Sequence, residues 1–204
     1  ATKAKILTYG TAVNADVKIL SSAINDQGCV TAKVASPWGE VELQMQTAGM
    51  HMAHNALAAL CVAGYLQIDL QTAARAISGA RISSSRMQIR KLKTGATVID
   101  DSYNANPASM RAALETLAKL PAKKKFAFCG LMAELADPAK EHLAIRAIAE
   151  DLNIELIAVN TDLYQTQAVS FEEAKSQLAK LGASDAALVK GSKVTGLVRL
   201  CDGL

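Results

Sequence analysis

The chain has 204 residues, of which 50% are hydrophobic and 20% are charged, and its formal net charge at pH 7 is +3. This length can bury one large or two small cores, and the composition is typical of an ordinary globular chain. The net charge is too small to indicate a nucleic-acid partner, and no transmembrane stretch stands out in the sequence. We therefore expect no nucleic acid among the partners and no membrane insertion.

The cysteines are far apart in the sequence and include no Cys-x-x-Cys pair: they are Cys29, Cys61, Cys129 and Cys201. Reduced thiols in the cytosol are the simplest interpretation, so we expect a cytoplasmic protein. The histidines have no ligand spacing with these cysteines, so we predict no metal ligands in this chain.

Residues 1–48 consist of short, partly alternating runs that predict strands. The expected strands are Lys5–Tyr9, Ala15–Ser21, Cys29–Ala35 and Glu40–Met45. A turn at 36–39 separates the last two strands, and we expect Trp38 to be a packing residue of that turn rather than a platform for a ligand.

Two apolar helices are predicted next, at about Ala53–Leu66 and Leu70–Ser78, and Asp69 is suited to cap the second. Residues 80–95 then form a junction. It comprises a serine-rich loop, a short strand and a turn, at 83–86, 87–92 and 93–95.

From residue 96 onward, runs of strand length alternate with helical patterns. Strands are expected at about 96–100, 125–129, 155–159 and 186–189, and helices at about 107–119, 138–151, 171–181 and 194–201. This alternation predicts an α/β fold with a Rossmann-like, doubly wound, mostly parallel sheet, which follows a β-rich and helical portion. We expect the boundary near residues 90–95, which gives domains of 1–92 and 93–204.

The most informative stretch is 100–110, which reads Asp-Asp-Ser-Tyr-Asn-Ala-Asn-Pro-Ala-Ser-Met. It follows the predicted strand at 96–99 and precedes a helix that Asn106 is suited to cap and Pro107 to begin. Ligands of open α/β sheets bind at such corners, at the carboxyl ends of strands. A turn explains some of these residue types, but two adjacent aspartates, a tyrosine and two asparagines exceed what a turn needs.

This corner resembles the start of the C-terminal domain of the Mur ligases, the ATP-dependent amide ligases of peptidoglycan synthesis. Further segments resemble the same family in the same order: Gly49–Ala59, Ser85–Gln88, Gly130–Leu135 and Lys190–Lys193. The resemblance implies that 1–92 is the C-terminal part of the central, ATP-binding domain and that 93–204 is the C-terminal domain.

The Asp-Ser-Tyr-Asn-Ala-Asn-Pro form of the corner is most similar to the branch that joins D-alanyl-D-alanine to UDP-N-acetylmuramoyl-tripeptide through an acyl phosphate. The resemblance implies these two substrates as partners, and ATP with Mg²⁺ as cofactors. The sequence contains no Gly-x-x-x-x-Gly-Lys-Ser/Thr loop, which such a ligase needs to hold the nucleotide phosphates, and it opens without an initiator Met. We therefore expect the C-terminal portion of a longer ligase, inactive by itself.

By the same resemblance, three residues are expected to contact the nucleotide. Asn55 would contact adenine, and the carboxylate of Asp101 would accept hydrogen bonds from the ribose hydroxyls. Arg86 would pair with phosphate across the domain interface and is the expected catalytic residue, because a guanidinium suits phosphate geometry. Since Arg86 and Asp101 should face a cleft, we expect their replacement by alanine to leave stability almost unchanged.

The residues expected to bind substrate are Tyr103, Asn104, Asn106, Lys190 and Ser192, of which the first three are expected to fix the turn or line the cleft. Among these, Lys190 and Ser192 follow an apolar strand and are expected to hold the carboxylate of the incoming dipeptide. Several positions depart from the family pattern, namely Met52 for asparagine, Leu131 for aspartate, Ala136 for glycine and Lys193 for arginine. Lysine at position 193 cannot form the bidentate hydrogen bonds that the planar guanidinium of arginine can form.

Two other interpretations stay open. One is a non-catalytic, Rossmann-like module that binds a nucleotide or a protein, which the missing phosphate loop favours for the isolated chain. The other is a related ligase, such as a different muropeptide ligase or a folylpolyglutamate-type synthase. The Ser-Tyr-Asn-Ala-Asn sequence of the corner argues against a related ligase.

Overall fold

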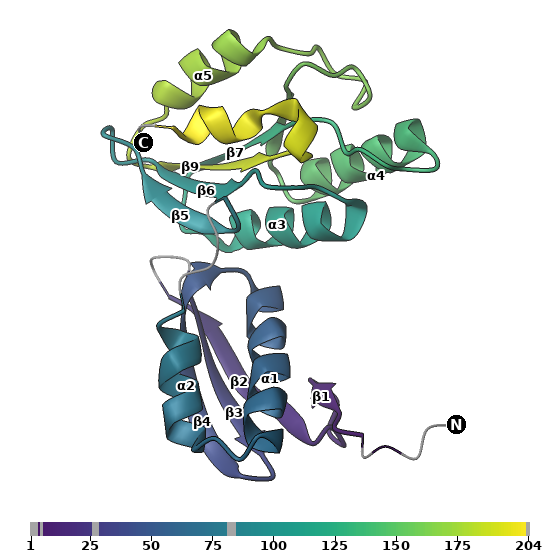
Figure 1. Ribbon diagram of the computed structural model, residues 1–204. Coiled ribbons are helices and arrows are strands. Elements are labelled where there is room, and N and C mark those ends of the chain that lie inside the picture. The colour runs from purple at the N-terminus through teal and green to yellow at the C-terminus, as the bar shows by residue number, and fades with distance from the viewer. Residues whose placement is uncertain (1–3, 5, 26–28, 81–84, 203–204) are drawn as a thin grey trace. The chain divides into compact units, whose positions relative to one another are not determined.

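The computed structural model of the protein describes residues 4, 6–25, 29–80 and 85–202. It divides into two compact units, Ala1–Arg81 and Ile82–Leu204, each of which is described by itself (Figure 1). Lys5 of the first predicted strand and residues 83–84 of the predicted loop lie outside the described residues. Within the described ranges, no helix combines the length and the hydropathy needed to span a membrane.

The first unit is a four-stranded sheet in the order β1-β2-β3-β4, with two helices that share its core. Its elements are β1 (Tyr9–Gly10), β2 (Val17–Ile24), β3 (Cys29–Ser36), β4 (Gly39–Ala48), α1 (Met50–Tyr65) and α2 (Leu70–Ser78). β1 is parallel to β2, and the other neighbours are antiparallel. Each predicted element is present, although β1 forms only at the end of the first predicted run.

Side-chain alternation along the strands defines the two faces of this sheet. In β3, Val30 and Val34 are fully buried, whereas Lys33 between them is exposed. Because successive strand residues point to opposite faces, one face meets the helices and the other stays open. Leu57 and Leu60 of α1 join the buried valines in one hydrophobic cluster.

Two local predictions for this unit are confirmed. The carboxylate of Asp69 accepts the backbone N–H of Thr72 at 2.8 Å and so caps α2. Trp38 packs against α1 at Gly64, where a Cβ atom would lie 2.3 Å from the indole ring. A glycine costs a helix about 1 kcal/mol relative to alanine, and here it makes room for the indole.

The second unit is a five-stranded sheet in the order β5-β6-β9-β7-β8. Its strands are β5 (Gln88–Lys91), β6 (Thr97–Asp101), β7 (Lys124–Cys129), β8 (Glu155–Ala158) and β9 (Asp185–Lys190). β5 is antiparallel to β6, and every other pair is parallel. This arrangement confirms the predicted mostly parallel α/β sheet.

Helices cover both faces of this sheet (Figure 1). α3 (Pro107–Lys119) and α4 (Pro138–Asp151) pack on one face, and α5 (Phe171–Ala179) packs on the other with the short helices η1 (Lys193–Thr195) and η2 (Leu197–Cys201). The single helix predicted at the end of the chain is instead two turns of 3₁₀ helix. Gly196 separates them with a φ of 65°, a left-handed conformation that glycine adopts without strain.

The second unit begins at Ile82, upstream of the expected boundary at 90–95. The reason is that β5 pairs with β6, with Gln88 opposite Asp100 and Lys91 opposite Thr97. An antiparallel edge strand therefore precedes the parallel sheet, and the junction strand belongs to the same sheet as the candidate corner.

We predict that residues 82–204 fold alone and are more stable than residues 93–204, the boundary that the sequence indicated. The shorter chain lacks β5, and with it Arg90, which lies 3.0 Å from the fully buried carboxylate of Asp100. Removing one partner of a buried ion pair typically costs about 3–5 kcal/mol. Denaturant unfolding of both chains measures the difference, and equal stabilities would show that β5 is dispensable.

Candidate functional site

Loops at the carboxyl ends of β6, β7 and β9 gather at one edge of the second sheet. The chain leaves β6 and β7 toward α3 and α4, whereas it leaves β9 toward η2 on the opposite face (Figure 1). Such a change of direction marks the place where ligands bind in open α/β sheets. The candidate corner lies at this edge, as the sequence predicted.

A buried ion pair joins two of these strand ends. The Lys190 ammonium donates to the Asp101 carboxylate and to the backbone oxygen of Asn104, the latter at 2.9 Å. The side chains of Lys190 and Asp101 are only 2% and 13% exposed. The pair arises from the register of the sheet, because Asp101 lies directly opposite Lys190 on the neighbouring parallel strand.

The segment that carries Arg86 is attached to the same corner. The backbone N–H of Met87 donates to the Asp101 carboxylate at 3.0 Å, and the N–H of Tyr103 donates to the oxygen of Ser85 at 3.0 Å. Ser85 and Met87 both have positive φ, at 64° and 49°. Such conformations cost about 1–3 kcal/mol each and concentrate at functional sites.

Arg86 itself is exposed, and its guanidinium lies 4.0 Å from the centroid of the Tyr103 ring. It takes part in no ion pair with the residues that the structure describes. A cation that stacks on an aromatic ring keeps its N–H groups available in the plane of the guanidinium. Arg86 is thus positioned to receive an anion.

Two residues predicted to bind substrate are used by the protein itself. The Ser192 hydroxyl accepts the N–H of Ala133 at 2.8 Å and donates to the oxygen of Ala105 at 3.3 Å. The Asn106 side chain caps α3 by accepting the N–H of Ser109 at 2.8 Å. Ser192 is 2% exposed, and with Lys190 it holds the loops together.

A pocket of about 460 Å³ lies between the loops. Its lining includes Tyr103, Asn104, Asn106 and Ser192, whose predicted contacts with substrate stay predictions, and also Glu134, Leu135, Lys193 and Val194. Two glycines allow the loops to approach so closely, because a Cβ on Gly191 would lie 3.1 Å from the Cα of Gly130.

Two buried residues that shape the β7–α4 loop were not predicted from the sequence. His142 accepts the N–H of Met132 through Nε2 at 2.9 Å and donates through Nδ1 to the oxygen of Pro138 at 2.6 Å. Tyr164 packs edge-on against the imidazole at 4.8 Å and donates its hydroxyl to the oxygen of Gly130 at 3.0 Å. The sequence carried no signal for these contacts, which join residues far apart in the chain.

Burial lowers the pKa of His142, and the neutral ring is the form that accepts from Met132. The unfolded chain takes up a proton near pH 6.5 and the folded chain at a lower pH, so stability falls as the pH drops through that interval. We predict that His142→Gln reduces this acid-side loss. Thermal unfolding of both chains between about pH 7.5 and 5 measures it, and parallel curves would contradict the prediction.

Asn55 lies on α1 of the first unit, where its side chain is exposed and its amide donates weakly to the Met52 sulfur at 3.7 Å. Its predicted contact with adenine stays a prediction. Within the described residues, no group of three or more His, Cys, Asp or Glu side chains is arranged to hold a metal ion.

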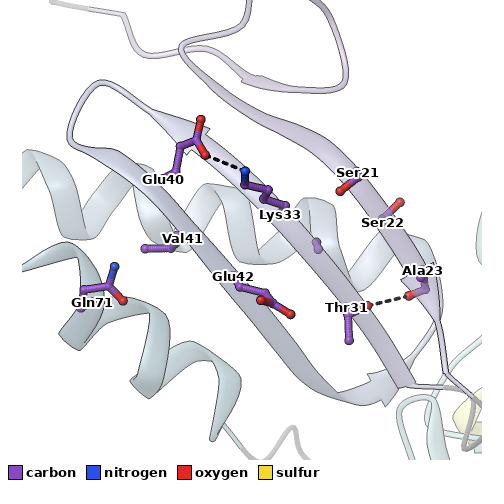
Figure 2. Close-up of a pocket in the computed structure, with 10 residues that line it drawn as sticks. Ser21, Ser22, Ala23, Thr31, Lys33, Glu40, Val41, Glu42 and Gln71 are labelled. Carbon is purple, nitrogen blue, oxygen red and sulfur yellow. Dashed lines mark hydrogen bonds and ion pairs between the residues drawn. The ribbon is translucent and has the colours of Figure 1, made fainter.

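A second pocket lies on the open face of the first sheet (Figure 2). Its charged lining includes Lys33 and Glu40, which pair at 2.9 Å and are both more than half exposed, and the Thr31 hydroxyl donates to the oxygen of Ala23 at 3.5 Å. Exposed ion pairs of this kind contribute little to the free energy of unfolding. None of the motifs found in the sequence lies in this pocket. This pocket is therefore not the candidate functional site.

The geometry defines a class of protein. It is a doubly wound α/β domain whose ligand site, at the carboxyl ends of the strands, is lined with polar and cationic side chains. The chain belongs to the Mur ligase family, because residues 85–193 match the model of the Mur ligase, glutamate ligase domain. The matched residues include the candidate corner, Arg86 and all of the pocket lining except Val194.

Relatives support this membership. The chain is 37% identical over 127 residues to the UDP-N-acetylmuramoyl-tripeptide–D-alanyl-D-alanine ligase of Mycobacterium tuberculosis, covering 59% of this chain and 25% of the relative. It is 31% identical over 200 residues to the corresponding ligase of Mycobacterium leprae, covering 81% and 39%. The chain thus spans well under half of the length of these curated relatives.

Solved structures share the fold. MurF from Acinetobacter baumannii matches with a TM-score of 0.82 and 28% identity, covering 97% of this chain and 46% of that one. MurF from Thermotoga maritima in complex with ADP matches with a TM-score of 0.81 at 20% identity, covering 96% and 47%, and shows the fold alone.

From the sequence, alanine at position 101 is expected to leave stability almost unchanged, but the buried contacts of Asp101 lead to a different prediction. Asp101→Ala leaves the buried ammonium of Lys190 without its carboxylate, so we predict a loss of about 3–5 kcal/mol in the free energy of unfolding. Arg86→Ala removes an exposed side chain and serves as the control, with an expected change of about 0.5 kcal/mol or less. Equal denaturant midpoints for the two variants would contradict the prediction.

Proposed function

We propose that this chain is part of an ATP-dependent ligase that adds D-alanyl-D-alanine to UDP-N-acetylmuramoyl-tripeptide in peptidoglycan synthesis. The observation that carries the proposal is the corner itself, where an unpaired arginine, an aspartate and a polar pocket meet at one sheet edge. Family membership and the ligases among the relatives support it. A cytoplasmic location, where nucleotide-activated precursors are made, is part of the same proposal.

Three residues of this chain are proposed to contact the nucleotide. Arg86 is free to pair with phosphate through its planar fork. Asp101, whose carboxylate accepts hydrogen bonds from Met87 and Lys190, would also accept hydrogen bonds from the ribose hydroxyls. Asn55 would meet adenine, and the first unit would be the C-terminal part of the ATP-binding domain.

When bound, ATP with Mg²⁺ would supply the phosphoryl group that activates the tripeptide carboxylate. The described residues fit only part of that task, because the corner offers the guanidinium of Arg86 and the carboxylate of Asp101, and the described residues include no group of three or more side chains arranged to hold a metal ion. The chain's own contribution is therefore to orient the nucleotide, to neutralise phosphate charge with Arg86 and to present the acceptor from the pocket.

A chimera tests the proposal directly. This chain replaces the matching 46% of Acinetobacter baumannii MurF, and ligation of D-alanyl-D-alanine to the UDP-linked tripeptide is measured. We predict an active chimera in which Arg86→Ala lowers kcat/KM for ATP by about 100- to 1000-fold, the scale for one positioned electrostatic contact.

The matched control is Arg111→Ala, which removes another exposed arginine from the same unit and should leave kcat/KM within about twofold, as expected of a surface substitution. A folded chimera without ligase activity would refute the proposed function. An active chimera that is insensitive to Arg86→Ala would refute the role of this arginine alone.

A further inference from the structure

The pocket between the loops has two charged lining residues, Glu134 and Lys193, one of each sign. Both side chains are exposed, and neither forms an ion pair with any described residue. Lys190 and Ser192, which the sequence reasoning assigned to the dipeptide carboxylate, are instead buried and occupied by internal contacts. A charged ligand in this pocket therefore meets Glu134 and Lys193.

Glu134 is held in a conformation that is costly for its residue type. Its φ is 62°, in the left-handed region that favours glycine or asparagine over glutamate. The two residues before it are fixed, because Met132 donates to His142 at 2.9 Å and Ala133 donates to Ser192 at 2.8 Å. A turn alone does not need a glutamate here, which points to a use for the carboxylate.

Lys193 lines the same pocket from another loop, at the start of η1. Its ammonium is 5.9 Å from the centroid of the Tyr103 ring, whose other cationic neighbour is Arg86. The aromatic face favours a cation nearby without consuming its hydrogen-bond donors. The lining thus presents a carboxylate and an ammonium, both available, to one pocket.

We propose that Glu134 binds the ammonium group, and Lys193 the carboxylate, of a zwitterionic dipeptide acceptor. This inference rests on the proposed function and names the residues that recognise its second substrate. The pocket volume of about 460 Å³ lies within the range of about 300–1,000 Å³ for small-molecule sites. Lys190 and Ser192 are positioning residues that hold the loops around the ligand.

Titration of the 204-residue chain, followed by amide NMR shifts, tests this assignment. The probes are D-alanyl-D-alanine, its N-acetyl derivative, which lacks the ammonium, and its carboxamide, which lacks the carboxylate. We expect the free dipeptide to shift amides at 133–135 and 192–194 and to bind about tenfold more tightly than either blocked form, as one lost charge-assisted hydrogen bond implies.

Glu134→Gln should abolish the preference for the free amine, and Lys193→Met the preference for the free carboxylate. Glu134→Gly should lose the same preference while it keeps its fold, because glycine suits the positive φ. The matched controls, Glu115→Gln and Lys119→Met on exposed positions of α3, should retain both preferences.

The assignment is overturned if the parental chain does not discriminate among the three probes, if the shifts cluster elsewhere, or if the two variants keep both preferences. Its failure is separate from that of the proposed function. An inactive chimera with intact discrimination would refute the ligase and leave the dipeptide site, whereas an active chimera without discrimination would refute only the site.

Discussion

The ion pair between Lys190 and Asp101 is the interaction on which the candidate site depends. The side chain of Lys190 is 2% exposed, and the parallel register of β6 and β9 places the carboxylate of Asp101 directly opposite it. The same ammonium holds the backbone of Asn104, and the same carboxylate holds the backbone of Met87. One buried pair therefore ties together the corner, the end of β9 and the segment that carries Arg86.

Polar residues around this pair fall into two groups with different tasks. Lys190, Ser192 and His142 are buried, and their polar atoms form hydrogen bonds with other parts of the protein. Arg86 and the pocket residues Glu134 and Lys193 are exposed and unpaired among the described residues. The first group fixes the loops so that the second group presents its charges in defined places, which is how rigid scaffolds support binding loops.

The sequence predicted those features that are encoded locally. α3 and α4 begin at Pro107 and Pro138, as expected, because an N-terminal proline and a capping side chain specify a helix start within a few residues. The alternation of strands and helices likewise predicted the parallel sheet. The polar residues of the corner predicted that ligands bind at the carboxyl end of β6.

What could not be predicted depends on contacts between distant residues. β5 joins the second unit through its pairing with β6, and that partner choice has no local signature. Lys190 and Ser192 looked like free ligands because their internal partners lie 59 to 89 residues away. The availability of Glu134 and Lys193 is likewise visible only once the loops are assembled.

A double-mutant cycle on Lys190→Met and Asp101→Leu is the most direct measurement of the central claim. Each single variant should lose about 3–5 kcal/mol of unfolding free energy, because it leaves one buried charge without its partner. The double variant should lose less than the sum by about 2–3 kcal/mol, since two apolar side chains can replace the pair. Additive losses in the cycle would mean that the two residues stabilise the fold independently, and that the pair does not organise the site.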